Sequence, residues 1–225
     1  GEVVTPPLDA AATQIGLVAV ASAADTDDRT VSGGPLGAAF DVSLGVDAND
    51  LSVQTARAAG VEHAMVFPSP SPNGIFAGQG ARLDLSRHED IVQRAQVAMF
   101  VTAGGAAAKA AGGSRAAMWG LLRMSLDEAR ALRGPPNPFK PRDQLQNHAD
   151  LEALMPVLER RMPLAVVANR EADIRQAVAV GRAQGISIVI VGGAEAWRAA
   201  DLLAANHVPV ILDPLDELPV NFDEI

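Results

Sequence analysis

The second half of the chain alternates short apolar runs with amphipathic segments. The apolar runs cover residues 164–167, 186–191 and 208–212 and are rich in valine and isoleucine. Such runs are typical of strands that are buried on both faces of a parallel sheet. Between them, residues 172–183 and 194–205 place apolar side chains at helical spacing. The pattern predicts right-handed βαβ units in which the three runs are adjacent parallel strands.

The first half has a less regular pattern. We expect strands over residues 15–21 and 64–67, and short helices over residues 50–59 and 91–100. Residues 68–80 are rich in Pro, Ser and Gly, which predicts a loop.

Two stronger helices are predicted in the middle of the chain. Residues 114–133 have Ser114 as a capping residue and are followed by Gly-Pro-Pro, which ends a helix. A Pro-rich connector over residues 134–143 leads to a helix over residues 148–159, in which Pro156 marks a kink or an early end. The elements indicate an α/β fold with about five to seven strands. An open doubly wound sheet and a (β/α)₈ barrel both accommodate this order of elements.

Blocks of sequence favour the barrel by resemblance. The first eight residues read Gly-Glu-Val-Val-Thr-Pro-Pro-Leu, and residues 57–63 read Arg-Ala-Ala-Gly-Val-Glu-His. Further blocks are Gly-Gln-Gly at 78–80, Ala-Gly-Gly-Ser-Arg at 111–115, Pro-Leu-Ala-Val at 163–166, Gly-Gly-Ala-Glu-Ala-Trp at 192–197 and Val-Pro-Val-Ile-Leu at 208–212. In order and spacing, these blocks resemble the imidazolonepropionase-like branch of the amidohydrolase superfamily over nearly the whole chain.

The resemblance implies most of a (β/α)₈ TIM-type barrel with parallel strands, formed by residues 1–225 as one partial domain. We expect the upstream β-sandwich and the last βα portion of the family to be missing from this segment. The resemblance also implies a hydrolase of amide or cyclic amide C–N bonds that uses zinc or a similar divalent metal. The similar proteins are bacterial and often exported; this suggests the periplasm, although the residues themselves leave the compartment open.

The residues at the family's metal-ligand positions do not suit a metal. The family ends its first barrel strand in His-x-His, and the corresponding residues here are Ala12 and Gln14. Val167 stands where a later family histidine follows the Pro-Leu-Ala-Val strand. A methyl group has no donor atom, and an amide oxygen is a poor ligand for zinc. We interpret the four histidines, at positions 63, 88, 148 and 207, as structural or exposed side chains.

Two functions therefore stay open. The first is a C–N hydrolase by descent with a degenerate metal site and no metal cofactor in this segment. The second is a non-catalytic binding or scaffolding protein, a pseudoenzyme on the same barrel, because a fold does not fix a function. An open α/β ligand-binding domain unrelated to the family is a third alternative.

Seven side chains are candidates for binding a small molecule, chiefly because the loops after barrel strands carry the chemistry of this fold. They are Gln14, Gln79, Ser114, Arg115, Asn169, Arg170 and Glu195. Ser114 and Arg115 form either an anion cradle or a plain helix start. Glu195 is either a favourable acid in the first turn of a helix or a pocket acid that faces Arg170.

Composition and charge exclude several classes of binding partner and site. The net charge of −9 and the pI of about 4.8 disfavour nucleic acid as a partner. The absence of cysteine excludes disulfides and thiolate metal sites. No apolar run is long enough to span a membrane. An open barrel exposes strand edges, so we also expect a second copy or a complementing fragment as a possible partner.

Overall fold

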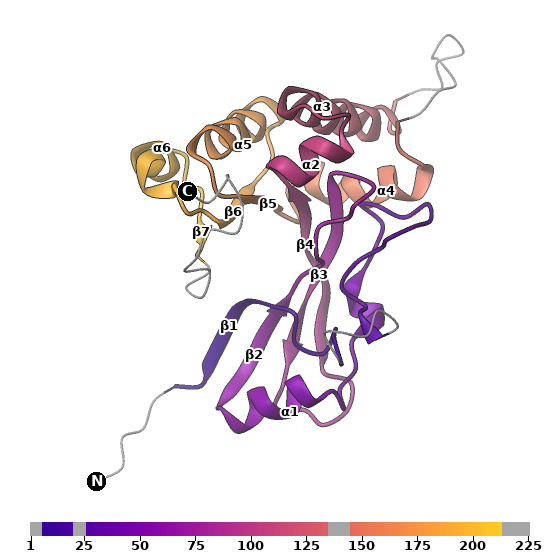
Figure 1. The fold of residues 1–225 in the computed structure, drawn as a ribbon, viewed down its shortest axis with the longest axis vertical. Helices are drawn as coiled ribbons and strands as arrows, with labels where there is room; N and C mark the ends of the chain where they lie inside the picture. The colour runs from indigo at the N-terminus through magenta and orange to yellow at the C-terminus, as the bar shows by residue number, and fades with distance from the viewer. Residues whose placement is uncertain (1–5, 20–25, 135–144, 213–225) are drawn as a thin grey trace.

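A computed structural model describes residues 6–19, 26–134 and 145–212 of the chain, and at its centre is one seven-stranded sheet in the order β1 to β7. The strands are β1 (Leu8–Thr13), β2 (Val61–Val66), β3 (Phe76–Asp84), β4 (Val92–Thr102), β5 (Leu164–Ala168), β6 (Ile188–Gly192) and β7 (Val210–Ile211). The sheet is strongly curved, and β1 and β7 are its two edges (Figure 1). The first five residues of the opening block and residues 135–143 of the connector lie outside the described part.

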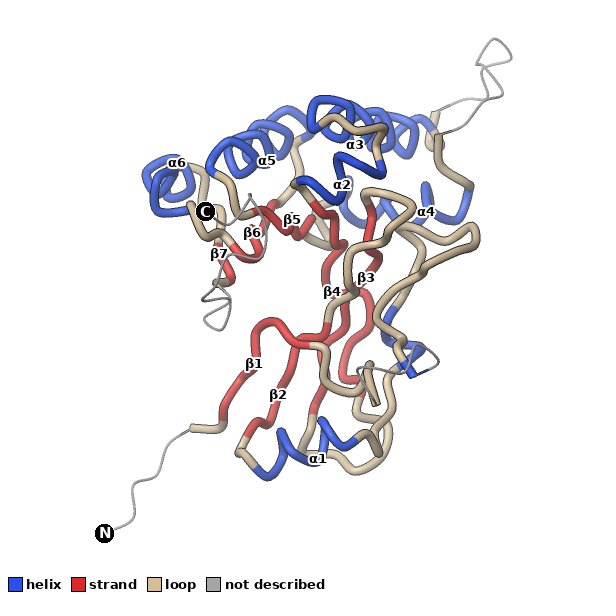
Figure 2. Tube along the Cα trace, viewed as in Figure 1, coloured by secondary structure: helices blue, strands red, loops and turns tan. Residues whose placement is uncertain are grey.

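Helices cover the convex side of the sheet (Figure 2). They are α1 (Leu51–Ala58), α2 (Gly105–Ala110), α3 (Arg115–Ala131), α4 (His148–Leu158), α5 (Glu171–Gln184) and α6 (Ala200–Ala205), with the 3₁₀ turns η2 (Val42–Gly45) and η3 (Ala196–Ala199). Two apolar clusters join these helices to the sheet, one beneath α2 to α5 and one beneath α1. The molecule is thus a mixed α/β protein with a barrel-like sheet. No helix in the described ranges is long and apolar enough to cross a membrane.

The prediction for the last three strands is confirmed. β5 pairs with β6 in parallel register, and β6 pairs with β7 in the same way. The intervening α5 ends at Gly185, which adopts the left-handed conformation that glycine tolerates best. These runs were identifiable because β5 and β6 are largely buried and all three runs are apolar; β7 is half-buried at the edge of the sheet.

The expectation that all strands are parallel is wrong for β3. This strand is antiparallel to both β2 and β4, whereas β1–β2 and β4 to β7 are parallel pairs. The connection from Asp84 to Val92 is closed by a hydrogen bond from the Asp84 amide to the Ile91 carbonyl oxygen, at 2.8 Å. Such a short connection supports a hairpin but not a parallel crossover, which needs about a dozen residues.

Three predictions for the first half differ from the structure. The loop expected over residues 68–80 ends before β3, which begins at Phe76. The helix expected over residues 91–100 is β4, because pairing with the long β3 overrides the weak helical periodicity. The strand expected over residues 15–21 is not found over residues 15–19, which follow the end of β1 at Thr13, and residues 20 and 21 lie outside the described part. Gly16 has a φ of 77°, and its amide donates to the Ser52 hydroxyl at 2.9 Å, so the chain turns away from the sheet there.

Candidate functional site

The carboxyl ends of six strands meet at one edge of the sheet. β1, β2 and β4 to β7 all run in one direction, and β3 runs against them. Ligands of α/β folds bind at this edge. Gln14 follows β1, Asn169 and Arg170 follow β5, and Glu195 lies in the loop after β6. Four of the seven predicted residues therefore lie at the edge where the family places its chemistry.

A bulge in β1 sets the direction of the side chains at its end. Ala10 pairs with Ala64 and Thr13 pairs with Val66, so two residues of β1 stand opposite the single residue between them on β2. Ala64 and Val66 pack into the cluster beneath α1, on the convex side. Thr13 points to that side as well, and alternation turns Gln14 to the concave face.

Val167, which stands where the similar family has a later histidine ligand, lies on the same concave face. Val167 packs against a small apolar cluster that contains Phe100, Ala165 and Val191, and this cluster faces away from the helices. Phe67 belongs to its margin and stacks on Phe100 at 5.4 Å between ring centroids. The end of β5 thus presents an apolar wall to the concave side.

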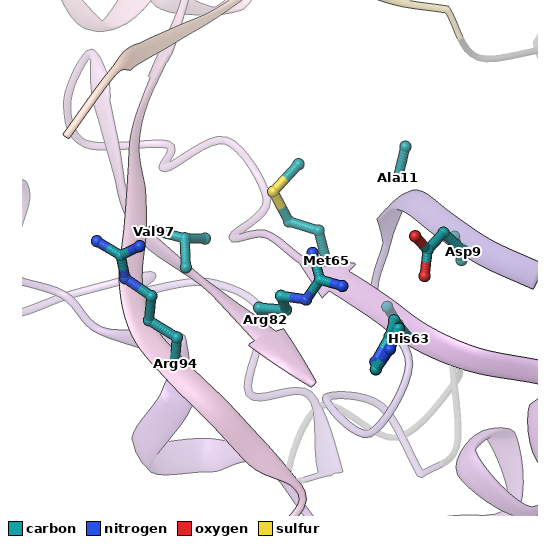
Figure 3. A pocket seen from close by; sticks show the side chains of 9 residues that line it. Asp9, Ala11, His63, Met65, Arg82, Arg94 and Val97 are labelled. Atoms are coloured by element: carbon teal, nitrogen blue, oxygen red, sulfur yellow. The ribbon is translucent and has the colours of Figure 1, made fainter. Parts of the chain in front are cut away.

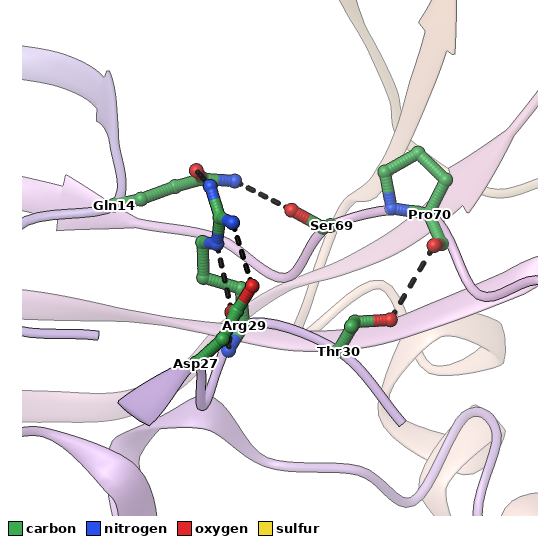
Figure 4. A network of polar contacts seen from close by, with 6 residues as sticks. All are labelled: Gln14, Asp27, Arg29, Thr30, Ser69 and Pro70. Carbon is green, nitrogen blue, oxygen red and sulfur yellow. Dashed lines mark hydrogen bonds and ion pairs between the residues drawn. The ribbon is translucent and has the colours of Figure 1, made fainter. Parts of the chain in front are cut away.

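Gln14 lies in a polar network in which both the nitrogen and the oxygen of its side-chain amide form hydrogen bonds (Figure 4). Its Nε2 donates to the Ser69 hydroxyl at 2.7 Å, and its Oε1 accepts from Arg29 Nη1 at 2.7 Å. Arg29 also donates from Nε and Nη2 to the two carboxylate oxygens of Asp27, at 2.8 and 2.6 Å. The hydrogen bonds from Arg29 lower the pKa of Asp27, and those same bonds to Asp27 raise the pKa of Arg29.

The substitution Asp27→Asn is expected to lower the free energy of unfolding at pH 7 by about 1 kcal/mol, as for partly exposed ion pairs. Because the pKa of Asp27 is lowered in the folded state, its stabilisation is present above the unfolded pKa of about 4. It is lost as the pH falls through the folded pKa, so the difference between variant and wild type should vanish in acid. Urea titrations at pH 7 and at a series of lower pH values measure this difference.

Asp28→Asn serves as the matched control, since the Asp28 side chain makes no ion pair with another residue of the described ranges. Equal losses in both variants at pH 7 would show that the Arg29 contact does not stabilise the fold.

The ends of β5 and β6 are joined by backbone contacts. Asn169 accepts from the amide of Ala194 through Oδ1 at 3.4 Å, and from the amide of Glu195 through its carbonyl oxygen at 2.9 Å. Gly192 has a φ of 89°, which favours glycine, and a Cβ atom there would lie 2.4 Å from Asn169 Oδ1. The two loops are therefore held together as one unit.

Glu195 caps a neighbouring helix in this unit. Its Oε2 accepts from the amide of Glu171, the first residue of α5, at 2.7 Å, and its Oε1 pairs with Arg198 at 3.2 Å. A carboxylate at a helix N-terminus satisfies a free amide and interacts favourably with the helix dipole. Arg170 is the N-cap residue of the same helix. These contacts give Glu195 a capping role at α5, a helix that precedes it in the chain, which neither of the two predictions for this residue included.

The other three predicted residues have partners outside the Gln14 network. Ser114 caps α3 by accepting from the amide of Ala117 at 3.5 Å. Arg115 pairs with the buried carboxylate of Asp173 on α5 at 3.5 Å. Gln79 is buried, and its Nε2 donates to the Ala38 carbonyl oxygen at 3.1 Å. The predicted set is thus divided among separate places.

The concave face of β1 to β4 also holds a cavity of about 400 Å³ (Figure 3). Its lining is formed by Asp9, Ala10, Ala11, His63, Ala64, Met65, Arg82, Arg94 and Val97. Asp9 and His63 lie early in β1 and β2, so the cavity lies toward the end of the strands opposite Gln14. Sequence patterns identified neither arginine as a candidate.

The residues at the end of β1 do not fit a zinc ion. Gln14 Oε1, the side-chain oxygen at the position of the family's histidine ligand, already accepts from the guanidinium group of Arg29 at 2.7 Å. A metal cation on that oxygen would face the positive charge of Arg29. Within the described ranges, no three His, Cys, Asp or Glu side chains gather into a possible metal site.

Comparison with known proteins shows the fold. No family model matches the chain, and no curated protein matches it. A solved structure of an amidohydrolase from Thermotoga maritima is similar, with a TM-score of 0.82 and 20% sequence identity. The match covers 98% of this chain and 60% of the Thermotoga chain, so the present chain spans less than two thirds of that protein. The chain therefore has an amidohydrolase-like fold.

Proposed function

We propose that this chain is the barrel part of an amidohydrolase-type protein that binds a small molecule at the carboxyl ends of its strands, without a metal ion held by β1. The observation that supports this proposal is the engagement of the Gln14 amide by Arg29 and Ser69. The resemblance to imidazolonepropionase-like hydrolases assigns a zinc ligand to that position. In this chain the residue at that position instead forms two hydrogen bonds, one of them with Arg29, which is itself paired with Asp27.

The network offers recognition groups rather than a metal-activated nucleophile. An amide, a hydroxyl and a guanidinium–carboxylate pair present both donors and acceptors at the end of β1. The apolar wall beside Val167 provides a surface for a non-polar part of a ligand. A few polar groups beside an apolar wall are typical of small-molecule sites.

Hydrolysis of amide or cyclic amide C–N bonds is the second candidate function. The likeness of the fold to the Thermotoga amidohydrolase favours it. Under this alternative, the metal or the general base would come from residues other than Ala12, Gln14 and Val167.

Metal content and hydrolysis together distinguish the two candidates. The purified chain, incubated with zinc, manganese or iron and then desalted, should retain far less than one equivalent of metal. It should not hydrolyse a panel of dipeptides and cyclic amides. Near-stoichiometric metal that accompanies hydrolysis would overturn the binding proposal.

Ligand binding is tested by thermal shift against a small-molecule collection. A compound that stabilises the wild type should lose its effect in Gln14→Ala and keep it in Gln54→Ala, which alters an exposed glutamine on α1. A compound that stabilises all three proteins equally would bind elsewhere and would contradict a site at Gln14.

A further inference from the structure

We propose that the concave face carries a second site, which binds a small organic anion through Arg82 and Arg94. The anion carries a carboxylate or a phosphate group. This site goes beyond the proposed function, because it uses the cavity toward the opposite end of the strands and none of the residues around Gln14.

The two arginines are paired on neighbouring strands. Arg82 on β3 and Arg94 on β4 are direct partners in the antiparallel ladder, and both line the cavity. Side chains of directly opposed residues leave the same face of a sheet, about 5 Å apart at Cβ. Like charges at such positions destabilise the pair. An anion between them would turn this repulsion into two favourable contacts.

A β-bulge creates this unfavourable pairing. Gly80 pairs with Ala98, so a regular ladder would place Arg94 opposite Asp84, with opposite charges facing each other. Extra residues in β4 shift the register, and Arg94 faces Arg82 instead. Gln96 in this bulge has a φ of 55°, a conformation that is uncommon outside glycine. Bulges occur often beside functional sites, where they redirect a side chain.

Neither guanidinium has a carboxylate partner within the described ranges. By contrast, Arg29, Arg87 and Arg130 each pair with an aspartate. The cavity lining contains two arginines and a single acid, Asp9, in a chain whose net charge is −9. The cavity is thus locally positive, and the planar guanidinium group matches a carboxylate or a phosphate.

The remaining lining suits an anion with an organic body. His63 Nδ1 is buried and has no hydrogen-bond partner in the described part of the chain, so it is available to a polar group of a ligand. Met65, Val97 and Ala11 supply apolar surface. A volume of about 400 Å³ is within the range of small-molecule sites and exceeds the needs of a bare ion.

Calorimetric titration of the full chain at constant ionic strength tests the site with two probes, inorganic phosphate and hexanoate. Arg82→Gln and Arg94→Gln are each expected to weaken binding by about tenfold or more, the effect of losing a charged hydrogen bond. Arg123→Gln removes an exposed arginine of α3 and should change nothing. Tighter binding of hexanoate identifies a carboxylate with an apolar body, and tighter binding of phosphate identifies a phosphate-bearing ligand.

Several results would overturn the proposal. One is no detectable binding of either probe to the wild type, and another is an equal loss in Arg82→Gln and Arg123→Gln. Without an anion, Arg82→Gln should be at least as stable as the wild type, because it removes the repulsion; a clear loss of stability would mean that the pair is structural. Arg82→Lys keeps the charge and should retain part of the binding. Gln14→Ala should bind both probes as the wild type does, which separates this site from the proposed function.

Discussion

The triple variant Ala12→His, Gln14→His, Val167→His is expected to bind zinc about a hundredfold more tightly than the wild-type chain, since three imidazoles form a zinc site with an open fourth position. The bulge in β1 turns position 14 to the concave face, and position 167 lies on that face at the end of β5. Isothermal titration with zinc, with circular dichroism to check the fold, measures the gain.

Arg29 should limit this gain. Its guanidinium contacts the side-chain amide of Gln14, so in the variant it would lie beside the new imidazole and oppose a bound cation. Adding Arg29→Gln to the triple variant is therefore expected to strengthen zinc binding by up to about fivefold, the effect of removing a partly exposed like charge.

A matched control replaces Ala12→His by Thr13→His, because Thr13 pairs with Val66 and points to the convex side. This control should gain much less affinity. If the original triple variant folds and gains nothing over the wild type, the three positions do not converge. The assignment of family ligand positions to this chain would then be wrong.

Gly78→Ala is expected to destabilise the fold by about 3 kcal/mol or more, the combined cost of an unfavourable backbone conformation and of overpacking. Gly78 has a φ of 127°, and a Cβ atom there would lie 2.6 Å from the carbonyl oxygen of Phe40. That oxygen cannot retreat easily, because it accepts from the amide of Gln79 at 2.7 Å. Urea denaturation at pH 7 gives the free energy of unfolding.

Gly74→Ala is the control for this substitution. Gly74 precedes β3, and a Cβ atom there would meet nothing within 4 Å. Its replacement should be neutral or slightly stabilising, because alanine reduces the entropy of the unfolded chain. A loss below about 1 kcal/mol in Gly78→Ala would show that the Phe40 segment moves aside at little cost.

The sequence predicted the part of the fold in which burial alone decides the structure. β5 and β6 are apolar and largely buried, the half-buried β7 is apolar as well, and this composition is visible without any partner. β1 has the sequence Leu-Asp-Ala-Ala-Ala-Thr, which is a poor strand by propensity, and pairing with β2 holds it in the sheet. β4 was mistaken for a helix because its pairing with β3 is a tertiary interaction, which the local sequence pattern does not reveal.

The candidate site was predictable only in part for a similar reason. Gln14 was identified from its correspondence to a metal-ligand position of the similar family, but its partners Arg29 and Ser69 lie 15 and 55 residues away along the chain. Contacts between loops leave no periodic pattern in a sequence. The Arg82–Arg94 pair depends on a register shift inside β4, which has no sequence signature either.

The reversed direction of β3 also has a consequence for the order of folding. Most neighbouring strands of the sheet are parallel, and the connection from β4 to β5 passes through α2, α3 and α4 before the pair can close. The β3–β4 pair closes through one short turn, so its loop-closure entropy is far smaller. Because local contacts form faster than distant ones, we expect this hairpin to form early in the middle of the sheet. Strand pairing can then spread from it toward both edges.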